Sequence, residues 1–220
     1  MKSGGWFVSK SLSTAASAWA CGLMLLAGCS STPTRVEMVE IDPDDAAAQA
    51  MAAYDANKDG RLADDELRAV PGILKWKQLY DTDGDGAVSQ AEIVARIEKW
   101  QSDQLAFCSV SANVKLNGKP VKGVEVTLVP EAYLGPGLKR AKGVTNRRGN
   151  AVLTVASEDL PEAIKVRGIS AMGAYTGTYR IELKHASINL PNVSRDGLQL
   201  GEEVARDTID TTFRLDLATK

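Results

Sequence analysis

The chain has 220 residues, with 26 Lys plus Arg, 28 Asp plus Glu, a single His and a formal net charge of -2. A hydrophobic share of 44% and a charged share of 25% are ordinary globular values, which exclude wholesale disorder, a collagen-like chain and a polytopic membrane protein. The near-neutral charge gives no reason to expect nucleic acid as a partner. One His also excludes any site that needs two imidazoles.

Residues 1–28 have the pattern of a secretory signal peptide. Lys2 and Lys10 give a positive start, and a short apolar run over residues 19–27 follows. This run is too short for a transmembrane helix, which needs about 20 apolar residues. We therefore expect an exported protein.

The end of this segment, Leu26-Ala27-Gly28-Cys29, resembles the lipobox of bacterial lipoproteins. The resemblance implies cleavage before Cys29, lipid on Cys29 and a membrane as partner through that anchor. We expect a cell-envelope protein at the periplasmic face of the outer membrane or at the cell surface, with residues 29–40 as a tether. The alternative is a plain secretory signal with an incidental Cys.

One cysteine remains in the expected mature chain. Cys21 leaves with the signal and Cys29 carries lipid, so Cys108 has no intramolecular disulfide partner. We expect Cys108 to be a buried small apolar residue, with a reactive thiol as the alternative.

Two segments, 55–66 and 81–92, match the pattern D-x-[DN]-x-[DN]-G-x5-E of the EF-hand calcium loop. Ca²⁺ takes six to eight oxygen ligands, and the pattern supplies them from positions 1, 3 and 5, the carbonyl of position 7 and a Glu at position 12. Gly at position 6 allows the sharp turn. The predicted ligands of two Ca²⁺ sites are Asp55, Asn57, Asp59, the Arg61 carbonyl and Glu66, and Asp81, Asp83, Asp85, the Ala87 carbonyl and Glu92.

The two loops differ in charge. The second loop carries one carboxylate more than the first, which predicts tighter binding there, subject to site rigidity. The position-8 residues, Leu62 and Val88, are expected to form a small antiparallel contact between the loops. The segment 41–100 is acidic in balance and residues 106–220 are basic, which agrees with cation sites in the first part.

Short helices are expected around the loops, so that residues 41–104 form an EF-hand pair. Asp42-Pro43 predicts a helix start, and Pro71-Gly72 should end the first exit helix near Val70. The middle helices are then only one to two turns long, which favours a structural calcium site over a sensor. Aromatic residues beside the loops, Tyr54, Trp76 and Tyr80, are expected to form the small core of the pair.

The remaining residues, 105–220, alternate apolar and polar side chains in six or seven short segments separated by turn signals. Examples are Val110 to Leu116, Val124 to Leu128 and Thr178 to Leu183. The predicted fold class is therefore multidomain α + β, with a small helical EF-hand pair followed by an antiparallel β-sandwich.

Several stretches resemble carboxypeptidase-regulatory-like domains, which are transthyretin-like β-sandwiches. They are Val114-Lys115-Leu116-Asn117-Gly118-Lys119-Pro120, Gly143-Val144-Thr145-Asn146-Arg147-Arg148-Gly149 and Gly177-Thr178-Tyr179-Arg180-Ile181. The closing Phe213-Arg214-Leu215-Asp216-Leu217 resembles a version common in planctomycete lipoproteins. Asn146 stands where the family usually has Asp. The resemblance implies a fold and a non-catalytic role in folding support, surface display or ligand contact.

The functional expectation is a calcium-binding, lipid-anchored envelope protein without catalytic activity of its own. Its β-sandwich would contact a protein or polysaccharide of the envelope. One alternative is a carbohydrate- or polymer-binding module, which requires exposed aromatics among Tyr133, Tyr175 and Tyr179. The other is a hydrolase, although the motifs of common nucleophiles are absent and His185 has no nucleophile tied to it.

Overall fold

The computed structural model describes residues 38–160, 165, 172–208 and 212–218. The predicted signal peptide, Cys29 and residues 29–37 of the expected tether lie outside the described residues. The residues from Thr34 to Lys220 group into one compact unit. Among the described residues, none of the helices combines the length and apolar character needed to cross a membrane.

The first helix, α1 (Pro43–Tyr54), begins where the sequence predicts. The carboxylate of Asp42 accepts a hydrogen bond from the backbone N–H of Asp45 at 3.1 Å, and Pro43 occupies the first helical position. Such a cap satisfies an N–H that the helix itself leaves unpaired. The helix buries its alanine face, formed by Ala46, Ala47 and Ala50.

Three very short helices connect the two acidic segments, as expected: α2 (Asp64–Leu67), α3 (Pro71–Lys75) and α4 (Lys77–Tyr80). The boundary prediction was wrong in one respect. The first of these helices ends at Leu67 rather than near Val70, and Pro71 begins the next helix instead of only ending the previous one. Proline is well tolerated at a first helical position because its missing N–H is not needed there.

The longest helix, α5 (Gln90–Asp103), starts with a reciprocal cap between Ser89 and Glu92. Its buried face contains Ile93, Ile97 and Trp100, which confirms the predicted apolar side. The same face also buries the guanidinium of Arg96, which the apolar periodicity does not predict.

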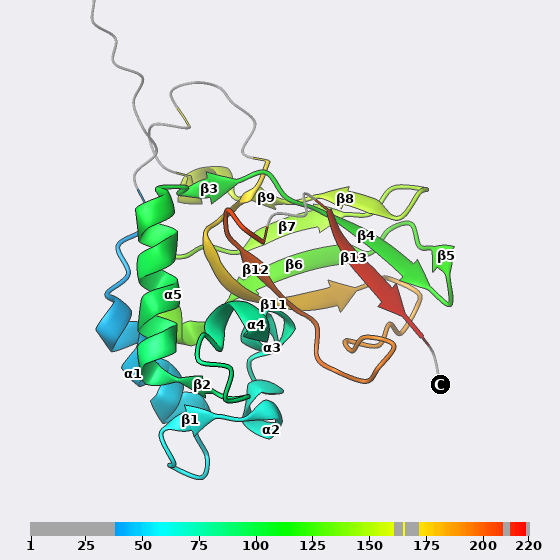
Figure 1. Ribbon diagram of the computed structural model, residues 1–220. Helices are drawn as coiled ribbons and strands as arrows, with labels where there is room; N and C mark the ends of the chain where they lie inside the picture. Colours follow the sequence, from blue (N-terminus) through cyan, green and yellow to red (C-terminus); the bar gives the residue numbers. More distant parts are fainter. Residues whose placement is uncertain (1–37, 161–164, 166–171, 209–211, 219–220) are drawn as a thin grey trace, which may run out of the picture. The chain divides into compact units, whose positions relative to one another are not determined.

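A five-stranded antiparallel sheet has the order β12-β11-β6-β7-β9. Its strands are β12 (Gly201–Val204), β11 (Gly177–Lys184), β6 (Glu125–Pro130), β7 (Ala141–Val144) and β9 (Thr154–Val155). A second sheet contains β13 (Thr212–Leu217), β4 (Ser111–Leu116), β5 (Lys119–Pro120) and β8 (Asn150–Val152). This mixed architecture, with its several antiparallel sheets, is compatible with a β-sandwich (Figure 1).

One strand pair departs from the antiparallel expectation. The last strand, β13, pairs with β4 in parallel, with Phe213 opposite Ala112 and Leu215 opposite Val114. Parallel neighbours need a long connection between them, and nearly the whole β-rich region supplies it here.

The remaining small elements complete the β-rich part. The pair β3 (Phe107–Cys108) and β10 (Ala174–Tyr175) is antiparallel, and 3-10 turns η1 (Ala132–Leu134) and η2 (Ser157–Asp159) follow β6 and β9. Cys108 is free and buried, which confirms its expected role as a small apolar residue. Burial raises the pKa of its thiol to about 11.

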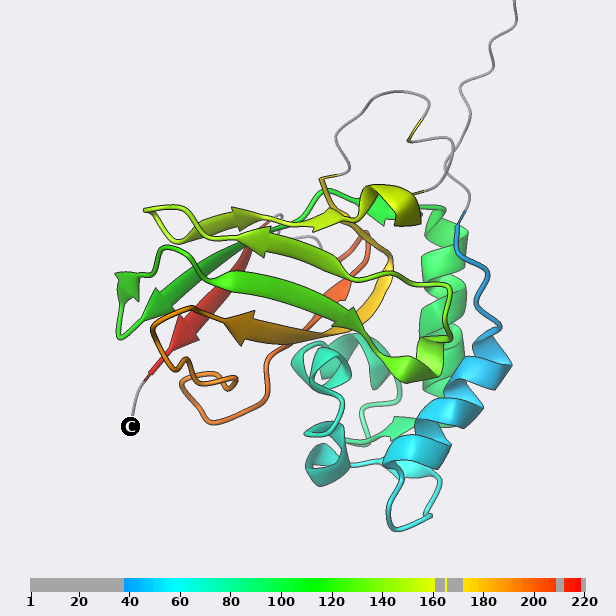
Figure 2. The same cartoon turned by 180° about the vertical axis from the view of Figure 1, so that it is seen from behind.

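The helices lie against the β-rich part in both views of the chain (Figures 1 and 2). Buried apolar residues of the helices and of the sheets form one continuous hydrophobic core. Helix α3 packs on β12 and β11 at a point where two glycines allow close approach. A Cβ on Gly201 would lie 2.4 Å from the backbone N of Gly72, so Gly201 has no room for a larger residue. A Cβ on Gly72 would lie 3.0 Å from the Glu202 carbonyl oxygen, which is a tight contact. The acidic loops are therefore attached to a packed surface of the sheet.

Candidate metal centre

The two acidic loops lie side by side because their eighth residues form a short antiparallel pair. Strands β1 (Arg61–Leu62) and β2 (Val88–Ser89) place Leu62 opposite Val88 and Arg61 opposite Ser89. Leu62 and Val88 are both fully buried. The predicted contact between the loops is confirmed.

In the first loop, the side chains of Asp55, Asn57 and Asp59 hold the backbone in a tight curl. The Asp55 Oδ2 accepts from the N–H of Gly60 at 3.0 Å, and the Asn57 Oδ1 accepts from the N–H of Asp59 at 2.8 Å. The Asp59 Oδ1 accepts from the N–H of Arg61 at 2.9 Å. These bonds orient the side chains of positions 1, 3 and 5 toward the inside of the curl.

The second loop repeats the same pattern. The Asp81 Oδ2 accepts from the N–H of Gly86 at 3.0 Å, and the Asp83 Oδ1 accepts from the N–H of Asp85 at 3.1 Å. The Asp85 Oδ1 accepts from the N–H of Ala87 at 2.9 Å. Two segments with different residues at other positions therefore adopt one hydrogen-bonding scheme.

The glutamate at the end of each loop reaches back to its beginning. Glu66 accepts from the N–H of Ala56 at 2.9 Å and of Ala63 at 3.0 Å. Glu92 accepts from the N–H of Thr82 at 2.7 Å and of Ser89 at 2.8 Å. Burial acts to raise the pKa of Glu92, but the hydrogen bonds donated by Ser89, Thr82 and Asp83 outweigh it and hold that pKa below its usual value.

Within the two acidic loops, as far as the structure describes them, two buried carboxylate oxygens have no hydrogen-bond partner. They are the Oδ1 atoms of Asp55 and Asp81, each at the first position of its loop. A buried anionic oxygen without a partner is costly unless a cation or a donor meets it. In the second loop, one oxygen each of Asp81, Asp83 and Asp85 lie within 4.8 Å of one another. Hard oxygen donors in this arrangement fit a hard divalent cation such as Ca²⁺.

Positive φ angles mark the sharp turns of the loops. Gly60 and Gly86, at position 6, have φ of 85° and 89°. At position 4 the second loop has Gly84 with φ 74°, whereas the first has Lys58 with φ 61°. A side chain in this left-handed region is strained by about 1–2 kcal/mol. The first loop therefore carries a local strain that the second does not.

Each loop is tied to the sheets by the tyrosine that precedes it. The Tyr54 phenol donates to the Oε2 of buried Glu131 at 2.9 Å, and the Tyr80 phenol donates to the Oε2 of buried Glu203 at 2.6 Å. Burial and the adjacent Glu131 raise the pKa of Tyr54 to about 12. Tyr80 lies in the hydrophobic core, and Tyr54 and Trp76 pack against it, as expected. This core is not confined to the helical pair, since it continues into the β-rich part, where the two hydroxyl groups bind acidic residues.

A buried arginine and one further buried acid, Glu202, strengthen this connection. The Arg96 guanidinium binds Glu203 and makes two hydrogen bonds of 2.8 Å to Asp207. Glu202 accepts from the Trp76 indole at 2.6 Å and forms an ion pair with Lys75. Burial raises the pKa of Glu203, with Arg96 acting in the opposite direction. The signal in the sequence was the adjacent pair of acids at 202–203 beside apolar strand residues.

The tyrosines required by the carbohydrate-binding alternative do not form an exposed platform. Tyr133, Tyr175 and Tyr179 are only 3%, 5% and 0% exposed.

His185 has a local structural role, since its Nδ1 accepts from the N–H groups of Ser187 and Ile188 at 3.0 Å.

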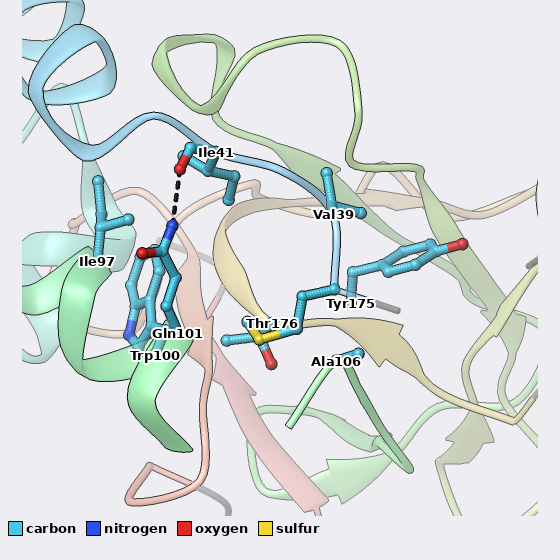
Figure 3. A pocket seen from close by; sticks show the side chains of 9 residues that line it. Val39, Ile41, Ile97, Trp100, Gln101, Ala106, Tyr175 and Thr176 are labelled. Atoms are coloured by element: carbon cyan, nitrogen blue, oxygen red, sulfur yellow. Dashed lines mark hydrogen bonds between the residues drawn. The ribbon is translucent and has the colours of Figure 1, made fainter. Parts of the chain in front are cut away.

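A small pocket lies where residues 38–41 cross α5 and the β3–β10 region (Figure 3). Its volume of about 10 Å³ is at the lower limit of what a single buried water needs. The lining is mostly apolar, and the Gln101 amide at its edge donates to the Ile41 carbonyl at 2.7 Å. The Trp100 indole N–H is buried there without a hydrogen-bond partner.

Comparison with known proteins adds one finding to this geometry. The loops and their acidic cluster define a class of oxygen-rich cation site. The chain is similar to the probable calcium-binding protein CML34 of Arabidopsis thaliana, with 33% identity over 73 residues. The match spans 29% of this chain and 56% of that protein. No family model and no solved structure matches the chain. The acidic cluster and this relative together support calcium binding.

Proposed function

We propose that the chain is a calcium-binding, lipid-anchored protein of the cell envelope, in which two EF-hand loops hold two Ca²⁺ ions against a β-sandwich. The unpaired buried Oδ1 atoms of Asp55 and Asp81 carry the proposal. The repeated hydrogen-bonding scheme of residues 55–66 and 81–92 and the calcium-binding relative support it.

The proposed ligands are those predicted from the sequence. They are Asp55, Asn57, Asp59, the Arg61 carbonyl and Glu66 in the first loop, and Asp81, Asp83, Asp85, the Ala87 carbonyl and Glu92 in the second. Bound Ca²⁺ supplies the positive charge that offsets repulsion among these carboxylates. The hydrogen bonds within each loop orient the donor oxygens. Tyr54 and Tyr80 connect the ordered loops to the β-rich part through their hydrogen bonds to Glu131 and Glu203.

The role we propose for calcium is structural rather than sensory. The helices between the loops have only four or five residues each, so they offer little surface to expose. Side chains of this region, including Tyr80 and Arg96, form buried hydrogen bonds with Glu203 of the β-rich part. Opening of the pair would break these bonds, which makes the large movement of calcium sensors costly.

Calorimetric titration tests the number of sites. Purified chain should bind two Ca²⁺, and the variants Glu66→Gln and Glu92→Gln should each bind one. Asp65→Asn is the matched control, because it removes the same charge from a side chain that is 94% exposed. Absence of binding heat at millimolar Ca²⁺ would remove the proposal.

Thermal unfolding provides a second measure. A ligand at about 100 times its dissociation constant stabilises the folded state by about 2.7 kcal/mol per site. The melting temperature should therefore be higher in Ca²⁺ than in EDTA, and Glu92→Gln should reduce the difference. Equal melting profiles in both buffers would contradict a structural role.

The anchor and the partner rest on the sequence. We propose lipid on Cys29 and a protein or polysaccharide of the envelope as the partner of the β-sandwich. No catalytic step is part of the proposal. Incorporation of labelled palmitate into the chain, abolished by Cys29→Ser, tests the anchor, and cross-linking in calcium-replete membranes followed by mass spectrometry tests the partner.

A further inference from the structure

One basic side chain reaches from the first loop into the second. Arg61 is the seventh residue of the first loop and lies opposite Ser89 in the β1–β2 pair. Its guanidinium forms an ion pair with the Oδ2 of Asp85. Asp85 is a member of the acidic cluster of the second loop.

A second basic side chain lies at the same junction. The Lys77 ammonium donates to the carbonyl of Gly86 in the second loop and to the Asp64 carboxylate at 2.6 Å. The Lys77 ammonium beside Asp64 holds the pKa of that carboxyl below its usual value. Lys77 binds a backbone carbonyl of the second loop, whereas Arg61 binds a carboxylate of its acidic cluster.

The guanidinium of Arg61 should stabilise the metal-free second loop and destabilise the metal-bound one. Carboxylates whose oxygens lie within 4.8 Å repel one another, and a guanidinium on one of them reduces that repulsion. A divalent cation entering the cluster meets the same positive charge and must compete for Asp85. The contact therefore stabilises the loop without metal and opposes its loading.

We propose that Arg61 is an internal competitor for the cation of the second loop and lowers the calcium affinity of that loop. The inference rests on the proposed function. Its consequence is that the second loop, despite one more carboxylate than the first, is weaker than its ligand set alone would make it. The backbone carbonyl of Arg61 serves the first loop and is unaffected by a change of side chain.

The test measures calcium affinity of the second loop alone, in the full chain carrying Glu66→Gln. Arg61→Gln should raise the association constant roughly three- to tenfold, because one positive charge leaves the cluster. The gain should shrink at 0.5 M KCl through screening. Arg61→Lys, which keeps the charge, should show a smaller gain.

Arg68→Gln is the control for overall charge. Arg68 lies just after α2, and its side chain pairs only weakly with Asp65, at 3.8 Å. An affinity that is unchanged or lower in Arg61→Gln, or an equal gain in Arg68→Gln, would overturn the inference while calcium binding stands. A chain that binds no calcium at all would instead overturn the proposed function, and this inference with it.

Thermal unfolding in EDTA gives an independent readout. Arg61→Gln should melt at a lower temperature than the parent chain in EDTA, because the repulsion in the second loop loses its counter-charge. The difference should disappear or reverse in saturating Ca²⁺. Equal melting temperatures in EDTA would count against the role of Arg61 in the metal-free loop.

Discussion

The Tyr80 phenol and the Glu203 carboxylate form a hydrogen bond of 2.6 Å inside the core, 123 residues apart in the chain. Tyr80 directly precedes Asp81, the first residue of the second acidic loop, and Glu203 lies in β12. Tyr54 and Glu131 repeat this relationship at the first loop. Both loops are therefore tied to the sheets at the point where each begins.

Removing the Tyr80 hydroxyl should destabilise the protein. Tyr80→Phe leaves the fully buried Glu203 without one of its donors, which costs about 1–3 kcal/mol of the free energy of unfolding. Tyr54→Phe should cost less, since Tyr54 is only partly buried. Urea unfolding in Ca²⁺ measures both, and a Tyr80→Phe variant as stable as the parent would show that this bond contributes nothing.

Glu131 should make stability depend on pH in an unusual direction. Burial raises its pKa, and the facing Arg180 guanidinium and Tyr54 phenol only partly oppose this effect. The folded state therefore binds the proton more tightly than the unfolded state. The contribution of Glu131 to the free energy of unfolding is fully present below the ordinary glutamate pKa. It is lost as pH rises through the raised pKa of Glu131.

Glu131→Gln should abolish that contribution. The difference in free energy of unfolding between parent and variant should shift in favour of the variant as pH rises from acid to neutral. Glu98→Gln on exposed α5 surface is the control and should show no such trend. Parallel pH profiles for the parent and Glu131→Gln would contradict the prediction.

Cys108 should be inert in the folded protein. Its thiol is buried, and burial raises its pKa to about 11, so the reactive thiolate is scarce at pH 8. In a chain with Cys21 and Cys29 replaced by Ser, iodoacetamide should label Cys108 only in denaturant. Rapid labelling of the folded chain, followed by mass spectrometry, would instead support the alternative of a reactive thiol.

The fourth position of the loops allows a reciprocal test of backbone strain. Lys58 and Gly84 both have positive φ, and nothing lies within 4 Å of a Cβ built on Gly84. Lys58→Gly should stabilise the chain by about 0.5–1 kcal/mol, whereas Gly84→Lys should destabilise it by about 1 kcal/mol or more. Urea unfolding in EDTA measures both, and a reversed order would exclude backbone strain as the cause.

The acidic loops were predictable because cation chemistry fixes both residue type and spacing over twelve residues. The α1 start was predictable for a similar reason, since Asp42 and Pro43 act locally. The pairing of Leu62 with Val88 followed from the equal position of the two residues in their loops.

The contacts between loops and sheets were not predictable in this way. Glu131 and Glu203 meet tyrosines 77 and 123 residues away, and no local pattern encodes such pairing. The apolar periodicity of α5 does not predict burial of the charged Arg96, whose partner Glu203 lies in β12. The parallel pairing of β13 with β4 likewise joins segments that are far apart in the chain, so no local pattern predicts it.

Helix α3 packs on β12, one of the two outer strands of the five-stranded sheet, and on its neighbour β11. An uncovered outer strand presents unpaired N–H and carbonyl groups that recruit strands from other molecules. We therefore expect the segment that joins the two acidic loops to restrict access to β12. If calcium orders this segment, prolonged storage in chelator should increase the turbidity of the sample.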